Sequence, residues 1–113
     1  MLDYLKDYNN IGMCFDAGHY HCHFKDNLNW DYFKNKILCV HLHDNDGEDD
    51  RHWLPYHGNI NWESVINNLK FANYNGPVVM EVTYRNLYTQ FYTLQEFYNE
   101  SFNRAKKLAE MLK

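Results

Sequence analysis

The sequence has little that would divide it into separate units. It contains no Pro-, Gly- or Ser-rich linker, no low-complexity tract and no internal repeat, and its 113 residues fit at most one ordinary domain. No apolar run approaches the ~20 residues that a membrane-spanning helix needs, and no signal peptide precedes the first predicted strand. We therefore expect a single soluble domain with a cytoplasmic location and no membrane contact.

Cysteine pairs and an excess of basic residues are also missing. The three cysteines, Cys14, Cys22 and Cys39, are odd in number and form no CxxC pair, so the sequence indicates neither a disulfide framework nor a thiolate zinc site. Lysine and arginine total 11 against 15 acidic residues, which gives a formal net charge of −4. Because Lys and Arg must neutralise phosphates for nucleic-acid affinity, we expect no nucleic-acid partner.

Three short apolar runs are predicted to be strands. They are IGMCF at 11–15, ILCVHLH at 37–43 and GPVVMEV at 76–82. Each run is nearly continuous rather than alternating, which is typical of parallel strands that are covered on both faces.

Helical patterns lie between and after these runs. A short helix is predicted over 29–35, and a longer one follows the N-cap residue Asn61. The last helix begins after Thr93, where a glutamate three residues on completes a capping box. Residues 1–9 are expected to be the end of an earlier helix or its exit loop. The alternation of strands and helices predicts an α/β fold built from parallel β-α units.

All three predicted strands end in side chains that carry ligand atoms. These are Asp16 and His19 after the first, His41, His43 and Asp44 at the second, and Glu81 near the end of the third. Parallel α/β sheets bind ligands at the carboxyl ends of their strands, so we expect Asp16, His41 and Glu81 to share one pocket. Two carboxylates and an imidazole suit Zn²⁺, Mn²⁺ or Mg²⁺. Any one of these residues could instead only cap a loop, but Glu81 would be costly to bury in an apolar run without a cation.

The loop that follows the second strand is predicted to cover the same pocket. We expect Arg51 and His52 to face it, because the guanidinium fork of Arg51 suits a substrate phosphate or hydroxyl. The acidic run before Arg51 is interpreted as a solvated face. His21 and His23 alternate in a segment interpreted as a loop, and alternation there does not by itself indicate a metal site.

Three motifs together resemble a known family. FDAGH, VHLHDNDGEDDRHWLPYHGNINW and GPVVMEV are similar, in order and spacing, to the C-terminal part of the xylose isomerase-like TIM-barrel superfamily. That superfamily includes the sugar phosphate isomerases and epimerases and the type 2 AP endonucleases. The resemblance implies that residues 1–113 are a single C-terminal fragment of a (β/α)8 domain, a partial barrel that contains its last three β-α units.

The resemblance also implies a ligand set. In the family a metal is held by a glutamate, an aspartate, a histidine and a second glutamate from four strands. Asp16, His41 and Glu81 match the last three of these, and the first glutamate has no counterpart in this sequence.

Further residues match positions at which the two branches of the family differ. His19 matches a histidine that contacts substrate in the epimerases and zinc in the endonucleases. Asp50 and His52 fall where the endonucleases carry a further zinc pair.

The function implied is that of a metal-dependent sugar or sugar-phosphate isomerase or epimerase. Glu81 would exchange a proton on one side of the substrate, next to a carbonyl that the metal polarises. Two alternatives stay open: an AP endonuclease-like phosphodiesterase and a non-catalytic truncated fragment. A fragment of a barrel is expected to self-associate or to lie beside the missing N-terminal part of the barrel.

Overall fold

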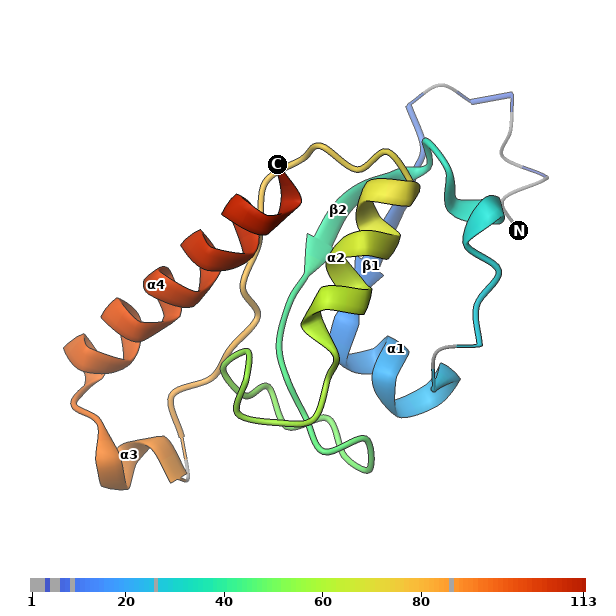
Figure 1. Ribbon diagram of the computed structural model, residues 1–113. Coiled ribbons are helices and arrows are strands. Elements are labelled where there is room, and N and C mark those ends of the chain that lie inside the picture. The colour runs from blue at the N-terminus through green and yellow to red at the C-terminus, as the bar shows by residue number, and fades with distance from the viewer. Residues whose placement is uncertain (1–3, 5–6, 9, 26, 86) are drawn as a thin grey trace.

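The computed structural model describes residues 4, 7–8, 10–25, 27–85 and 87–113. Its elements in chain order are β1 (Met13–Asp16), α1 (Ala17–Phe24), the 3-10 turn η2 (Trp30–Phe33), β2 (Ile37–His41), α2 (Trp62–Phe71), α3 (Leu87–Phe91) and α4 (Leu94–Leu112) (Figure 1). The segment predicted as the end of an earlier helix, 1–9, lies largely outside the described residues. Within the described ranges, no helix has both the length and the apolar composition to cross a membrane.

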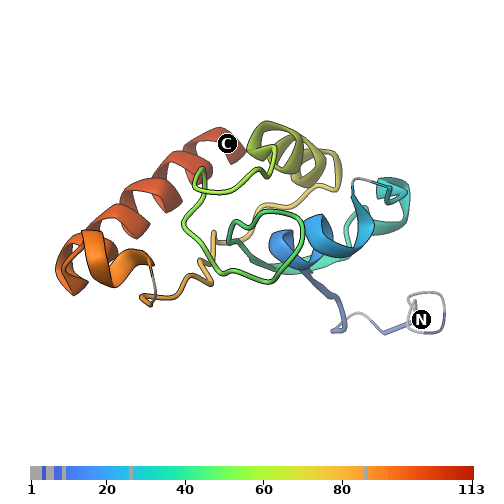
Figure 2. The same ribbon diagram turned by 90° about the horizontal axis from the view of Figure 1, so that it is seen from below.

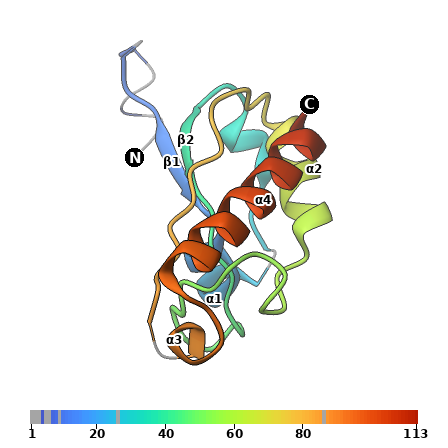
Figure 3. The ribbon, with the colours of Figure 1, turned by 90° about the vertical axis from the view of Figure 1, so that its left-hand side faces the viewer.

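The sheet is parallel, as predicted, but smaller than predicted. β1 pairs with β2 so that Cys14 lies opposite Cys39 and Asp16 opposite His41. The third predicted strand, 76–82, is reduced to one parallel bridge between Leu42 and Met80. The extended chain runs beside β2, as Figures 1 and 3 show.

The bridge at Met80 does not extend further along the chain, because the residues beyond Leu42 pair elsewhere. Leu42 donates its N–H to the Val79 carbonyl (2.9 Å) and accepts from the Glu81 N–H (3.1 Å). Asp44, two residues on, exchanges backbone hydrogen bonds of 2.8 and 2.9 Å with Trp53 of the following loop. The two bonds at Leu42 are nevertheless enough to place Glu81 next to the end of β2.

The helix predicted after Asn61 is confirmed as α2. The Asn61 side chain accepts a hydrogen bond of 3.0 Å from the Ser64 backbone N–H, which satisfies one of the unpaired donors at the helix start. One face of α2 lies in the main core, through Trp62, Val65, Ile66 and Leu69. Burial of that face holds the helix against the sheet.

The capping box at Thr93 also forms and begins α4. The C-terminal end of α4 lies beside α2 in all three ribbon views, with Leu108 buried in the main core (Figure 2). Leu94, Tyr98 and Phe102 on the same helix are exposed, Phe102 by 70%. The apolar stripe of α4 is therefore only partly covered by this chain.

Helix α1 corrects the interpretation of the segment with His21 and His23 as a loop. Asp16 is its N-cap and accepts a hydrogen bond of 2.9 Å from the His19 backbone N–H. His21 and His23 lie on this helix and not in a loop. The helix predicted over 29–35 is present only as the short turn η2.

Candidate metal centre

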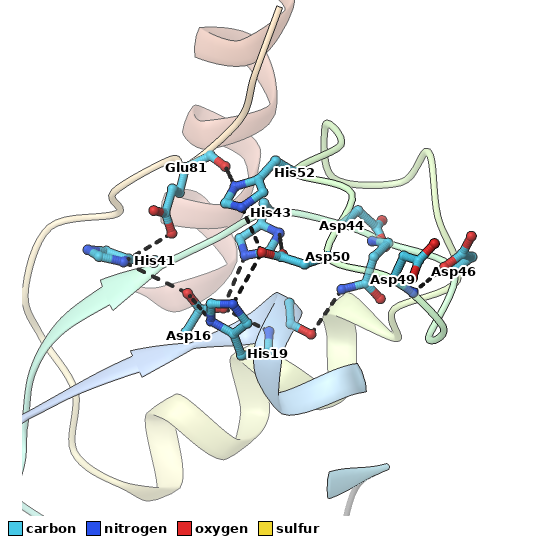
Figure 4. A network of polar contacts seen from close by, with 12 residues as sticks. Asp16, His19, His41, His43, Asp44, Asp46, Asp49, Asp50, His52 and Glu81 are labelled. Carbon is cyan, nitrogen blue, oxygen red and sulfur yellow. Dashed lines mark hydrogen bonds and ion pairs between the residues drawn. The ribbon is translucent and has the colours of Figure 1, made fainter. Parts of the chain in front are cut away.

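The strand ends bring Asp16, His41 and Glu81 together, as Figure 4 shows. Nδ1 of His41 lies 3.1 Å from Oε2 of Glu81 and 3.8 Å from Oδ2 of Asp16. One ligand atom from each of the three residues lies within 4.8 Å of the others. This convergence follows from the Asp16–His41 register and from the backbone bond that places Glu81 beside Leu42.

This donor set fits a divalent cation. Two ligands bound at about 2.1 Å to one ion lie roughly 3.0–3.5 Å apart, so small movements would bring all three into one coordination shell. Oε2 of Glu81 is buried and forms no hydrogen bond, even though the His41 ring is near. A bound cation would satisfy this oxygen at once. Nothing in this geometry distinguishes Zn²⁺, Mn²⁺ and Mg²⁺.

Asp16 is held in its ionised form. Burial by itself would raise the pKa of Asp16. The hydrogen bonds from His43 (3.1 Å) and from the His19 backbone N–H, with the two nearby imidazoles, outweigh burial and hold this pKa well below its usual range. An ionised carboxylate is the form that binds a cation.

His43 is a part of this cluster that the sequence analysis did not select. It is fully buried, its Nε2–H donates to Asp16, and its Nδ1 has no hydrogen-bond partner. Gly18 makes room for it, because a Cβ at Gly18 would collide with the His43 ring. The His-x-His spacing of 41 and 43 was the available signal, since alternate residues of a strand share a face.

A second polar group adjoins the first and contains His19, Asp50 and His52. Oδ2 of Asp50 lies 3.2 Å from Nε2 of His19 and 2.9 Å from Nε2 of His52. His52 donates from Nδ1 to the Glu81 carbonyl (2.7 Å), and its ring stacks on that of His43 at 4.2 Å. The predicted position of His52 at the mouth is therefore seen in the structure.

His19 joins the two groups. Its Nδ1 lies 3.0 Å from Asp16, and its side chain is half exposed at the mouth. Burial would lower the pKa of His19, but the charges of Asp16 and Asp50 outweigh burial and raise it. A histidine at this place can donate a hydrogen bond to a ligand that enters the mouth.

The prediction that Arg51 faces the same mouth is wrong. Its guanidinium pairs with Asp46 (3.0 Å) and Asp49 (2.9 Å). Figure 4 shows these two aspartates well apart from Glu81 and His41. The acidic run that precedes Arg51 supplies local partners, and these hold the arginine on the outer part of the loop.

Asp44 ends β2 but does not join the cluster. Its carboxylate is fully buried and accepts hydrogen bonds from Tyr56 N (2.8 Å), Ile60 N (3.2 Å) and Trp62 Nε1 (2.9 Å). These bonds fold the loop between β2 and α2. Asp44 is therefore a structural residue, although its position in the sequence resembles that of a ligand.

Two cysteines lie beside the cluster on the sheet. Cys14 and Cys39 are partners across the two strands, two residues before Asp16 and His41 respectively. Burial, together with Cys39, raises the pKa of Cys14 to about 11. The thiol of Cys14 is thus protonated near neutral pH in the free protein.

Comparison with known proteins agrees with this geometry. The family model described as "Xylose isomerase-like TIM barrel" matches residues 1–113. The chain superposes on the crystal structure of a D-tagatose 3-epimerase-like protein with a TM-score of 0.57 and 25% identity, covering 96% of this chain and 39% of that one.

Curated relatives give the same family. An uncharacterized protein of Methanocaldococcus jannaschii is 35% identical over 72% of this chain and 29% of its own length. An uncharacterized protein of Sinorhizobium fredii is 28% identical over 90% of this chain and 32% of its own length. A probable endonuclease 4 of Mycoplasma mycoides is 26% identical over 59% of this chain and 28% of its own length. The chain thus spans about a third of the length of these relatives. The strand-end cluster and the match over the whole sequence together place this chain in the xylose isomerase-like TIM barrel family.

Proposed function

We propose that this chain forms the metal-binding side of a sugar or sugar-phosphate isomerase or epimerase. The observation that carries the proposal is the meeting of Asp16, His41 and Glu81, with one buried Glu81 oxygen that forms no hydrogen bond and lies 3.1 Å from the His41 ring. When bound, the divalent metal would polarise the substrate carbonyl and make the adjacent C–H acidic. Asp16, His41 and Glu81 would hold it.

Glu81 is the residue we assign to proton transfer. The carboxyl group reaches the mouth beside His41, and its backbone is held on both sides, by Leu42 and by His52. A carboxylate fixed in this way can remove a proton from a carbon next to the carbonyl and return it. His19 and His52 line the same mouth, and each would donate a hydrogen bond to a substrate oxygen in place of its present contact with Asp50. Arg51 has no part in this proposal.

The opposite side of the substrate requires groups from elsewhere in a barrel. Two-sided proton transfer needs a second carboxylate, which the family resemblance places on a strand outside this sequence. We infer that the partial barrel is completed by further β-α units. The incompletely paired sheet and the exposed stripe of α4 support this inference.

A test of this proposal should measure ligand binding, because this chain by itself lacks the second carboxylate. Sugar protons close to bound Mn²⁺ relax faster in nuclear magnetic resonance spectra. With chain and Mn²⁺ together, we expect faster relaxation of the protons beside the carbonyl of a ketose or ketose phosphate. Glu81→Gln should reduce this effect, and Glu63→Gln, an exposed glutamate of α2, should leave it unchanged. Tight Mn²⁺ binding with no sugar relaxation would refute the isomerase assignment.

A second function, phosphodiester cleavage at abasic DNA, rests on a separate observation. Asp50 lies within hydrogen-bond distance of both His19 and His52. The types and order of these three residues resemble a zinc set of the endonuclease branch. The probable endonuclease 4 relatives belong to the same branch. The net charge of −4 opposes this function. Zn²⁺-dependent binding of an oligonucleotide with an abasic site, stronger than binding of any sugar, would favour it.

A further inference from the structure

We propose that Cys14, Cys39 and His41 form a second cation site, selective for thiophilic ions such as Zn²⁺ or Cd²⁺, which shares His41 with the candidate centre above. One sulfur from each cysteine and one ring nitrogen of His41 lie within 4.8 Å of one another. Residue spacing does not indicate such a site, because the cysteines form no CxxC pair. The pairing arises only because the parallel register sets Cys14 opposite Cys39.

The two strands place these ligands on one face of the sheet. Alternate residues of a strand point to the same side, so Cys14 lies with Asp16, and Cys39 lies with His41. Phe15 and Val40, between them, are buried in the main core on the opposite side. The face with the cysteines is open, because Cys14 is exposed and Cys39 is partly exposed. A cation can therefore reach both sulfurs from solution.

The ligand types set the selectivity. Zinc binds thiolate sulfur at about 2.3 Å and imidazole nitrogen at about 2.0–2.1 Å in a tetrahedron, so ligand atoms on one ion lie roughly 3.4–3.8 Å apart. Separations within 4.8 Å need only side-chain rotation to close around an ion. Binding would replace the two thiol protons by the cation and release both to solvent, with no change of oxidation state. Hard cations that prefer oxygen, such as Mg²⁺, would not compete here.

Sharing of His41 makes the two sites antagonistic, and this part rests on the proposed function. His41 is the only nitrogen ligand in each set of three. A thiophilic ion held by Cys14 and Cys39 would draw His41 away from Asp16 and Glu81 and weaken the oxygen-rich site. The thiol site would then act as a sensor through which excess zinc or cadmium lowers Mn²⁺ binding.

Cysteine alkylation in the unmutated chain tests the site directly. The reduced protein is labelled with an alkylating agent with and without Cd²⁺, and mass spectrometry follows each cysteine separately. We expect Cd²⁺ to slow labelling of Cys14 and Cys39 by roughly tenfold or more, because a metal-bound thiolate is withdrawn from reaction. Cys22, on α1 and outside the group, is the internal control and should react equally with and without Cd²⁺. Equal labelling of Cys14 and Cys39 with and without Cd²⁺ would overturn the proposal.

Serine variants separate this site from the candidate centre above. Cys14→Ser and Cys39→Ser should each remove the ultraviolet thiolate-to-cadmium charge-transfer band, whereas Cys22→Ser should keep it. Both cysteine variants should bind Mn²⁺ as the parent chain does, and Cd²⁺ should weaken that binding less than in the parent chain, because only direct competition at the candidate centre remains. A band that survives in Cys14→Ser would contradict the site itself. Loss of the band in both variants, with Cd²⁺ weakening Mn²⁺ binding equally in the parent chain and the variants, would contradict only the sharing of His41.

Discussion

Asp44 and Glu81 are two carboxylates at the same end of the sheet, but the protein satisfies only one of them. Four N–H groups, of Asn45, Tyr56, Ile60 and Trp62, donate hydrogen bonds to the buried carboxylate of Asp44. Oε2 of Glu81 is also buried and accepts no hydrogen bond. The comparison shows that the donors around a strand-end carboxylate, rather than its place in the sequence, decide whether it builds the fold or is free to bind a cation.

Removing the charge of Asp44 should have the largest effect. In Asp44→Asn, the side-chain amide cannot accept from all four N–H groups, so the free energy of unfolding should fall by about 3 kcal/mol or more. Asp16→Asn, which changes a carboxylate of the candidate site, should lower the free energy of unfolding clearly less. Urea unfolding of both variants measures the difference. Equal losses of unfolding free energy in the two variants would mean that Asp44 is no more important for the fold than a carboxylate of the candidate site.

Gly18→Ala should have the next largest effect. The new methyl group would collide with the His43 ring and force it away from Asp16. Overpacking of this kind costs about 1–3 kcal/mol, which a shift of the unfolding midpoint would report. The same variant should bind Mn²⁺ more weakly. The control is Ala17→Gly, in the same turn of α1, which leaves the space beside His43 unchanged and should not weaken Mn²⁺ binding. If both variants bound Mn²⁺ equally weakly, the contact with His43 would not be the cause.

Thr93→Ala should have a smaller effect, because the hydrogen bonds that it removes, those of the capping box, are exposed to solvent. Glu96 and Thr93 satisfy each other at the start of α4, and both are exposed. Loss of an N-cap costs about 1 kcal/mol. Thermal unfolding measured by circular dichroism would show this loss. If Thr93→Ala lowered the free energy of unfolding as much as Asp44→Asn, burial of the hydrogen bonds would not determine the size of the loss.

The smallest effect concerns pH. The pKa of Asp16 is lower in the folded chain than its unfolded value of about 3.9, so its stabilising contribution is complete above that value and is lost as the pH falls below it. The stability advantage of the parent chain over Asp16→Asn should therefore shrink as the pH falls from about 4 towards 2. Urea unfolding of both chains over this range measures the advantage. If this stability advantage grew as the pH fell, the pKa of Asp16 would be raised by folding, which would contradict the prediction.

The helix starts and the meeting of the strand-end ligands could be predicted from the residue pattern alone. Asn61 and Thr93 begin their helices as predicted, because capping depends on residues within one turn. The meeting of Asp16, His41 and Glu81 could be anticipated, because parallel strands align their carboxyl ends.

The predictions that were wrong concerned residues whose partners lie far away in the sequence, or local features such as a helix cap that were overlooked. The role of Asp44 is set by N–H groups up to 18 residues away. The bridge between Leu42 and Met80 does not extend beyond Met80, because Asp44 pairs with Trp53. α1 was missed although Asp16, an N-cap residue type, stands just before it. The position of Arg51 was decided by nearby aspartates that were interpreted only as a solvated face.

Calorimetric titration of the chain with Mn²⁺ tests the central claim most directly. The account predicts one bound ion, with an affinity that falls roughly ten- to a hundredfold in Glu81→Gln and is unchanged in the matched variant Glu63→Gln. Asp16→Asn and His41→Ala should lower the affinity in the same way. Binding of Mn²⁺ that is equally strong in the parent chain, Glu81→Gln and Asp16→Asn, or no binding in any of them, would contradict the claim that these strand ends form a metal centre.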